Sequence, residues 1–196
     1  MYGESSIDSS VELGAINEML SAIGEPPVNT LDGEANLDVA NALRILENVN
    51  REIQAKGWTF NIEKNVPLYP DAFSGLIPFE LDILNMRSSE TSTPYVNLGG
   101  YVYDRLSRKD TFEGPINVDI IRQRTLEEMP ECFRRWIVVR ASKRFAGRFL
   151  ADPSTIDMLN YEENEARMDC NTYELDYGNY NALQGDNYIL QMLQRG

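Results

Sequence analysis

The chain has 196 residues, 42% of them hydrophobic and 25% charged, which predicts a globular domain with a buried core; it contains no run of about 18 apolar residues that would indicate a membrane helix. Its net charge of −13 disfavours ordinary binding to nucleic-acid phosphates but does not exclude a surface past which DNA slides without sticking. The absence of histidine excludes Ser–His and Cys–His nucleophile pairs and most zinc and haem sites, and it leaves only carboxylate, lysine, tyrosine or hard-cation chemistry open. No cofactor or metal is expected.

Residues 10–23 predict an amphipathic helix, because their apolar side chains recur three or four positions apart. Ser10 is the expected N-cap, and Gly24 is the expected residue after the helix. In the segment that follows, two consecutive prolines fix φ and push the residues before them toward extended geometry. We therefore expect residues 25–33 to form a stiff, exposed spur rather than a flexible linker.

A second amphipathic helix is predicted at residues 36–56. It is expected to begin near Asn36 or Asp38 and to stop at Gly57. The stretch LDGEANLD, residues 31–38, has only a superficial likeness to a calcium-binding loop, since the required order and spacing of ligands are absent. A turn that leads into a helix cap is the expected structure there.

From residue 58 to residue 125 the hydrophobic period changes to two, which predicts a mostly antiparallel β region. Alternating patterns occur at residues 58–62, 79–83 and 116–120. The clearest hairpin is YVNLGGYVYDR, residues 95–105, in which Gly99–Gly100 forms a two-residue turn with positive φ at both positions. This glycine pair lacks the pattern of a phosphate-binding loop.

Two further helices are predicted at residues 130–151 and 153–177, with Asp152 as N-cap and Pro153 as first helical residue. The first is rich in arginine and the second in acidic residues, so we expect them to pair as antiparallel neighbours. The arginines could alternatively contact DNA, but the adjacent acids would cancel the field that a phosphate feels. The apolar stretch YILQMLQ, residues 188–194, needs a surface in the same chain or in a partner.

The predicted fold class is therefore α+β. A four-helix bundle is formed by residues 1–57 and 126–177, and a mostly antiparallel β insert at residues 58–125 separates its second and third helices. Residues 178–196 form a C-terminal tail.

No set of residues predicts an enzyme. Paired carboxylates occur at Glu127–Glu128 and at Glu162–Glu163, but neighbours in a helix point about 100° apart and do not face one substrate, so a solvated helix surface is the better interpretation. Cys132 and Cys170 lie at similar distances on either side of Asp152, so they could be level with each other. They are expected to remain reduced thiols in a cytosolic setting.

Several sequence blocks, in order and with characteristic gaps, resemble the tail tubular protein A family, the head-to-tail adaptors or gatekeepers of short-tailed bacteriophages. The blocks are INEML, AIGEPPVNTLDGEANLDVANALRIL, NREIQAKGWTFN, YVNLGGYVYDR, EEMPECFRRWIV and YELDYGNYNAL. The resemblance runs from about Val11 to about Leu183. It implies a structural virion protein of the tail, assembled in the host cytoplasm, with a helical-bundle core and no catalysis.

The resemblance also implies partners. Family members form a twelve-subunit ring below the portal and above the nozzle protein, tail tubular protein B, and tail fibres attach near the joint. DNA leaves through the ring, without sequence-specific binding. The expected ring-interface residues are Pro26, Pro27 and Val28, unless the spur only covers the end of its own bundle. The expected surface toward nozzle or fibres is the hairpin at Leu98, Gly99, Gly100 and Tyr101. The expected portal clasp comprises Tyr180, Tyr188, Leu190, Met192 and Leu193.

Two other functions remain open at this point. A tail-associated carbohydrate hydrolase would need two acids about 5–10 Å apart in one cleft, and no spacing in the sequence indicates such a pair. A monomeric acidic DNA mimic or inhibitor would place its acids along one face, spaced like phosphates.

Overall fold

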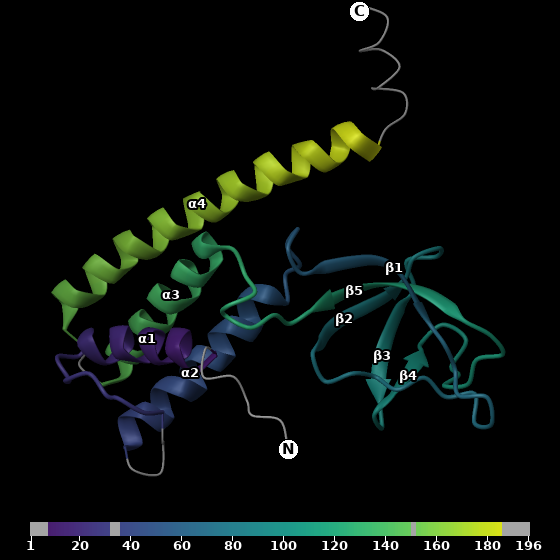
Figure 1. Ribbon diagram of the computed structural model, residues 1–196, viewed down its shortest axis with the longest axis horizontal. Helices are drawn as coiled ribbons and strands as arrows, with labels where there is room; N and C mark the ends of the chain where they lie inside the picture. The colour runs from purple at the N-terminus through teal and green to yellow at the C-terminus, as the bar shows by residue number, and fades with distance from the viewer. Residues whose placement is uncertain (1–7, 32–35, 150–151, 186–196) are drawn as a thin grey trace, which may run out of the picture. The chain divides into compact units, whose positions relative to one another are not determined.

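The computed structural model describes residues 8–31, 36–149 and 152–185, with side chains described within residues 10–177 of these ranges (Figure 1). The fold is α+β, with helices and a five-stranded sheet. The chain divides into two compact units. The helical unit comprises Met1–Asn50 and Leu126–Gly196, and the β unit comprises Arg51–Thr125.

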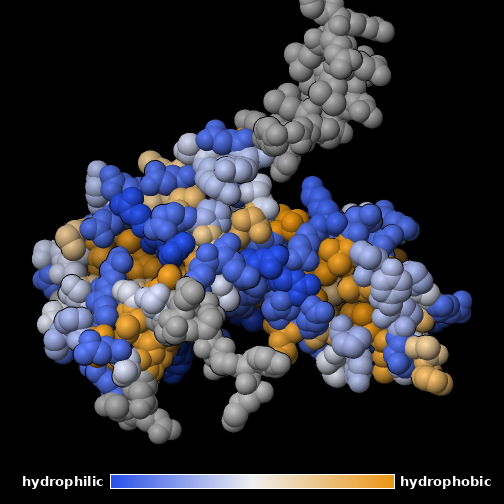
Figure 2. All heavy atoms as spheres, in the orientation of Figure 1, coloured by the Kyte–Doolittle hydropathy of each residue, from blue (hydrophilic) through white to orange (hydrophobic). Residues whose placement is uncertain are grey.

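The helices are α1 (Asp8–Ser21), α2 (Leu37–Gln54), α3 (Glu131–Phe149) and α4 (Pro153–Gly185). Their apolar faces form a core in the helical unit in which Ile16, Met19, Leu20, Phe133, Trp136, Ile137 and Phe145 are among the largest fully buried side chains. On the face shown in Figure 2, hydrophilic side chains cover much of the surface, and hydrophobic patches lie between them.

The glycine after α1 ends the helix as the sequence predicts. Gly24 has a φ of +80°. The Glu25 amide donates to the Leu20 carbonyl over 3.1 Å, and the Gly24 amide donates to the Ser21 carbonyl over 3.0 Å. This pair of bonds is a Schellman motif, which favours glycine at the left-handed position. The prediction of Ser10 as N-cap is wrong, because α1 begins two residues earlier and Ser10 lies inside it.

Asn36 is the residue that caps α2. Its side-chain Oδ1 accepts the amides of Asp38 over 2.9 Å and of Val39 over 3.4 Å, which satisfies two of the free N–H groups at the helix start. The helix ends at Gln54, and Gly57 follows with a φ of +79°. The cap predicted within residues 31–38 is thus confirmed, although residues 32–35 lie outside the described residues.

Asp152 caps α4, as predicted. Its Oδ2 accepts the Thr155 amide over 2.8 Å and the hydroxyls of Ser154 and Thr155. The hydroxyl of Ser154, followed by that of Thr155, holds the pKa of the Asp152 carboxyl at about 2. The helix continues eight residues past its predicted end at residue 177, so residues 178–185 belong to α4 rather than to a tail. A single glycine at position 178 costs only about 1 kcal/mol within a helix, which does not suffice to end it.

Helices α3 and α4 pack as antiparallel neighbours, as their charges predict (Figure 1). Arg135 contacts Asp169 at 3.5 Å, and Arg140 contacts Glu163 at 3.1 Å. Residue numbers that rise along α3 therefore fall along α4. Lys143 also pairs with Glu163.

The sheet is antiparallel throughout, with strand order β1-β5-β2-β3-β4. The strands are β1 (Ile62–Leu68), β2 (Ile83–Ser88), β3 (Pro94–Leu98), β4 (Tyr101–Asp104) and β5 (Ile116–Arg122). One face carries a core made of Ile77, Ile83, Met86, Val102, Val118 and Ile120.

Two of the predicted strand starts are wrong. Residues 58–61 form a turn, because the Asn61 side chain accepts the Trp58 amide over 2.7 Å and the Asn61 amide donates to the Trp58 carbonyl over 3.0 Å. Phe79 lies in a short segment that is joined to β4 and its turn by single backbone hydrogen bonds and an isolated bridge between Pro78 and Tyr101. Pro78 has no N–H, so the segment cannot extend these bonds into a regular strand pairing. Leu81 lies in a turn and is exposed.

Candidate interaction surfaces

The β3–β4 hairpin has the turn that its sequence predicts. Leu98 pairs with Tyr101, and between them Gly99 and Gly100 have φ values of 64° and 89°. Positive φ at both central positions matches the twist of the flanking strands. The Gly100 amide donates to the Asn97 side chain over 2.9 Å, which holds the turn further.

The tip of this hairpin is open, whereas the outer edge of β4 is covered. The Val102 amide donates to the Ile77 carbonyl over 2.9 Å, and the Phe79 amide donates to the Gly100 carbonyl over the same distance. Residues 77–79 therefore occupy the edge at which a foreign strand could otherwise pair. Leu98 and Tyr101 remain exposed at the tip, so side chains there, rather than backbone pairing, are what a partner can contact.

We expect Gly100→Ala to lower the free energy of unfolding of the β unit by about 1 kcal/mol, because a Cβ strains the left-handed backbone. Gly14→Ala is the matched control. Gly14 lies in α1 with open space around it, so the same change there should stabilise the protein by about 0.5–1 kcal/mol. Denaturant titration measures both. A Gly100→Ala protein as stable as the wild type would contradict the strained turn.

The segment after α1 is fixed to that helix by one side chain. The Val28 amide donates to Oδ1 of Asn17 over 2.7 Å, and Nδ2 of Asn17 donates to the Val28 carbonyl over 3.0 Å. Val28 is half-buried, while Pro26 and Pro27 are exposed. The sequence did not identify Asn17 as the anchor, because an asparagine on a helix surface has no local signature of a partner eleven residues later.

We expect Asn17→Ala to release Val28 and to cost about 1–2 kcal/mol, since two hydrogen bonds are lost. Hydrogen exchange at the Val28 amide should become markedly faster. Asn41→Ala is the control, because the Asn41 side chain of α2 accepts a hydrogen bond from Arg44, three residues away in the same helix, over 3.2 Å. Unchanged exchange at Val28 in the Asn17 variant would contradict the anchoring.

Most of the portal-clasp candidates cannot be placed. Tyr180 lies in α4, and its side chain lies outside the described residues. Tyr188, Leu190, Met192 and Leu193 also lie outside the described residues.

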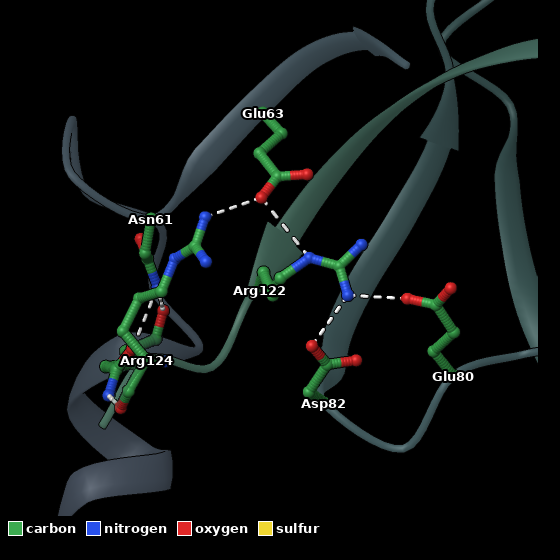
Figure 3. Close-up of polar contacts among 7 residues, drawn as sticks. Asn61, Glu63, Glu80, Asp82, Arg122 and Arg124 are labelled. Atoms are coloured by element: carbon green, nitrogen blue, oxygen red, sulfur yellow. Dashed lines mark hydrogen bonds and ion pairs between the residues drawn. The ribbon is translucent and has the colours of Figure 1, made fainter. Parts of the chain in front are cut away.

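A network of charged side chains joins three parts of the β unit (Figure 3). The Arg122 guanidinium contacts Glu63 at 3.2 Å and both Glu80 and Asp82 at 2.6 Å. Arg124 reaches the same Glu63 oxygen at 2.6 Å. Burial opposes the charged form of Arg122, but the hydrogen bonds to Asp82 and Glu80 raise its pKa above the ordinary value. The network fixes β5 to β1 and to the turn before β2, and its cations are neutralised, so it does not form a phosphate-binding surface.

The basic side chains of α3 are largely engaged within the helical unit. Arg134 pairs with Glu131 at 3.3 Å, and Arg135, Arg140 and Lys143 pair with acids of α4. These pairs favour the interpretation of the arginine-rich helix as an internal ion-pairing surface rather than a DNA contact.

The neighbouring carboxylates Glu162 and Glu163 lie near different groups. Glu163 faces Arg140 and Lys143. Glu162 instead lies near Glu18, and the pKa of Glu18 is raised, mainly by burial and further by the negative charge of Glu162. Within residues 8–31, 36–149 and 152–185, no group of three or more acidic, cysteine or histidine side chains could hold a metal ion. In the same part of the chain, no helix combines the length and hydropathy needed to cross a bilayer.

The two cysteines lie opposite each other across α3 and α4, as their positions around Asp152 suggest. Both are free thiols, and their sulfur atoms share a hydrogen bond. Burial raises the pKa of both thiols, so neither is an activated nucleophile.

Comparison with known proteins shows the family to which the chain is related. The sequence model of the family described as "Tail tubular protein" matches residues 13–180. Tail tubular protein A of Klebsiella phage KP34 is 27% identical to this chain over 127 residues, which cover 64% of this chain and 66% of the relative. Since the family match spans most of its length, the chain belongs to the tail tubular protein family, whose members are structural proteins of the phage tail.

Proposed function

We propose that this chain is the head-to-tail adaptor of a short-tailed phage. Twelve copies form a ring that joins the portal to the nozzle protein, tail tubular protein B, and continues the channel through which DNA leaves. The observation that carries the proposal is the family match over residues 13–180. Glu163 adds support for a role without catalysis, because Arg140 and Lys143 bind its carboxylate inside the helical unit.

Charge supports the proposed channel. Each copy carries a net charge of −13, so a ring of copies has a strongly acidic surface. A wall with the same sign of charge as DNA lets the duplex pass without condensing on it. We infer that DNA passes through the ring without sequence-specific binding, and that the ring is assembled in the host cytoplasm.

The candidate surfaces have separate roles in this proposal. Residues 1–57 and 126–177 form a four-helix bundle, and the spur with Pro26, Pro27 and Val28 reaches a neighbouring subunit. The double hydrogen bond from Asn17 supports this role, because a segment already held in one conformation loses little entropy on docking. The tip at Leu98, Gly99, Gly100 and Tyr101 meets the nozzle or the fibres. Tyr180, Tyr188, Leu190, Met192 and Leu193 contact the portal.

Ordered reconstitution tests the adaptor role. DNA-filled heads purified from an infection that lacks this protein are mixed with the nozzle protein, with and without the purified chain, and imaged by electron microscopy. We expect the nozzle to bind only heads that have first taken up this protein. Nozzle binding to heads without it, or failure of the protein to bind heads, would contradict the proposal.

Deletion of residues 184–196 tests the portal contact in the same assay. The truncated protein should keep its thermal unfolding midpoint and lose binding to heads. Normal binding of the truncated protein would exclude these residues as the clasp.

A further inference from the structure

Within residues 153–177, helix α4 has one packed face and an opposite face that is exposed. The inner face repeats at spacings of four and three residues, through Leu159, Glu163, Ala166 and Cys170, and these side chains are buried. The outer face carries Tyr161, Met168 and Leu175, which are seven residues apart and 66%, 66% and 65% exposed. A spacing of seven is close to two turns, so the three side chains form one stripe about 21 Å long. We call it the α4 stripe.

The α4 stripe lies beside acidic residues. Asp157, Glu165 and Asp176 are exposed on the same side of the helix. Glu165 contacts Arg135 at 3.8 Å and accepts a hydrogen bond from the Tyr161 hydroxyl. Large apolar side chains in an exposed row are typical of an interaction surface. The acids beside the row disfavour pairing with another copy of α4, because like charges would come close to each other. A partner for this stripe should instead carry an apolar side chain surrounded by cations.

The chain itself contains a segment of that kind. The loop between β4 and β5 reads Arg105, Leu106, Ser107, Arg108 and Lys109, and all five residues are exposed. Leu106 is 78% exposed, and three of the other four residues are cationic. We call residues 105–109 the basic loop. Within a chain of net charge −13, this loop combines an exposed apolar tip with flanking positive charge.

The basic loop is held in a defined shape by the residue that precedes it. The Asp104 carboxylate accepts the Leu106 amide over 2.7 Å and the Ser107 amide over 3.3 Å, and it also accepts the Ser107 hydroxyl. Backbone bonds between Asp104 and Lys109 close the loop. Arg108 has a φ of +58°, a conformation that non-glycine residues adopt only at a cost. A fixed loop keeps Leu106 exposed and lowers the entropy lost on docking.

We propose that the basic loop of one copy docks on the α4 stripe of a second copy, with Leu106 against Met168 and its neighbours and the loop cations against Asp157, Glu165 and Asp176. This inference rests on the proposed ring and names one of its contacts. Because the two surfaces differ, the contact is heterologous, and repetition of a heterologous contact generates a closed ring when the rotation allows it.

Two sets of substitutions test this contact: reversal of the loop charges alone, and reversal of the charges on both surfaces together. Arg105→Glu with Arg108→Glu should weaken self-assembly at least tenfold, measured by light scattering over a concentration series with and without the portal. The control is Lys64→Glu with Arg44→Glu, which changes the net charge equally at two exposed positions that belong to neither surface. Adding Asp157→Arg and Asp176→Arg to the loop variant should restore assembly. Circular dichroism confirms that each variant is folded.

A cross-linking experiment reports the contact directly. Equal amounts of unlabelled and ¹⁵N-labelled protein are mixed, treated with a carbodiimide and digested. We expect Lys109 of one copy linked to an acid within residues 157–176 of another, seen by mass spectrometry as mixed-isotope pairs.

The outcomes separate the contact from the ring. Loop variants that assemble like the wild type, or loss of assembly that the α4 exchange does not reverse, would overturn the contact and leave the adaptor role intact. If the loop variants assemble normally but are no longer retained on immobilised duplex DNA, the basic loop contacts DNA rather than a second copy. A wild-type chain that stays monomeric with and without the portal, and shows no mixed-isotope links, would overturn both.

Discussion

Glu163→Ala is expected to lower the free energy of unfolding of the helical unit by about 2–4 kcal/mol. Glu163 is nearly buried between α3 and α4, and it pairs with both Arg140 and Lys143. Its removal leaves two partly buried cations without their acid, which costs more than the pair contributes when intact. Denaturant titration followed by Trp136 fluorescence, in a Trp58→Phe background, reports this unit alone.

The Glu163 effect should also depend on pH. Burial raises the pKa of Glu163, but the hydrogen bond from Lys143 and the charges of Lys143 and Arg140 outweigh it, so the pKa is lowered. A lowered pKa in the folded state contributes stability above the ordinary pKa of a glutamate, and that stability is lost as pH falls through the folded value. The difference between variant and wild type should therefore shrink on acidification.

Glu12→Gln serves as a control, because its expected effect on stability has the opposite sign to that of Glu163→Ala. Burial, together with the charges of Glu127 and Glu47, raises the pKa of Glu12, so its ionised form destabilises the folded state at neutral pH. This variant should stabilise the helical unit at pH 7 and have no effect well below the ordinary pKa of glutamate. A Glu163→Ala difference that stays constant with pH, or a destabilised Glu12→Gln protein, would contradict the charge assignment.

Asn61→Ala is expected to lower the free energy of unfolding of the β unit by about 2–4 kcal/mol. The Asn61 side chain is fully buried, accepts the Trp58 amide over 2.7 Å and donates to the Gln54 carbonyl over 3.0 Å. Its truncation removes the acceptor of the half-buried Trp58 amide and takes from the Gln54 carbonyl one of its two donors, the Gly57 amide being the other. The lost hydrogen bonds and the space left by a fully buried side chain both lower stability. Trp58 fluorescence in a Trp136→Phe background measures the effect.

Asn117→Ala is the matched control for that change. Asn117 lies on β5 with an exposed side chain, so its truncation should change stability by less than about 0.5 kcal/mol. Equal losses for the two variants would contradict a special role of Asn61 in joining the end of α2 to the turn before β1.

The features that the sequence predicts correctly are those decided by neighbouring residues. Asn36 and Asp152 cap helices through side chains that reach two or three residues ahead, and Gly99–Gly100 fits a two-residue turn by its own freedom at positive φ. The pairing of α3 with α4 also follows from local information, since a short connection joins two helices of opposite charge.

The features that it misses depend on distant partners. Arg122 meets acids 40 to 59 residues earlier in the chain, and no local pattern indicates that they converge. Alternation at residues 58–62 predicts a strand, but the Asn61 side chain binds the Trp58 amide and folds that stretch into a turn. The basic loop and the α4 stripe require knowledge of which loop and helix residues are exposed, which periodicity alone does not supply.

Self-assembly is central to the adaptor role, and the solution mass of the purified chain tests it. Light scattering is recorded for the protein alone and after addition of the portal. We expect a species of twelve times the 22.3 kDa chain, free or bound to the portal. A chain that remains at 22.3 kDa and does not associate with the portal would contradict the adaptor role.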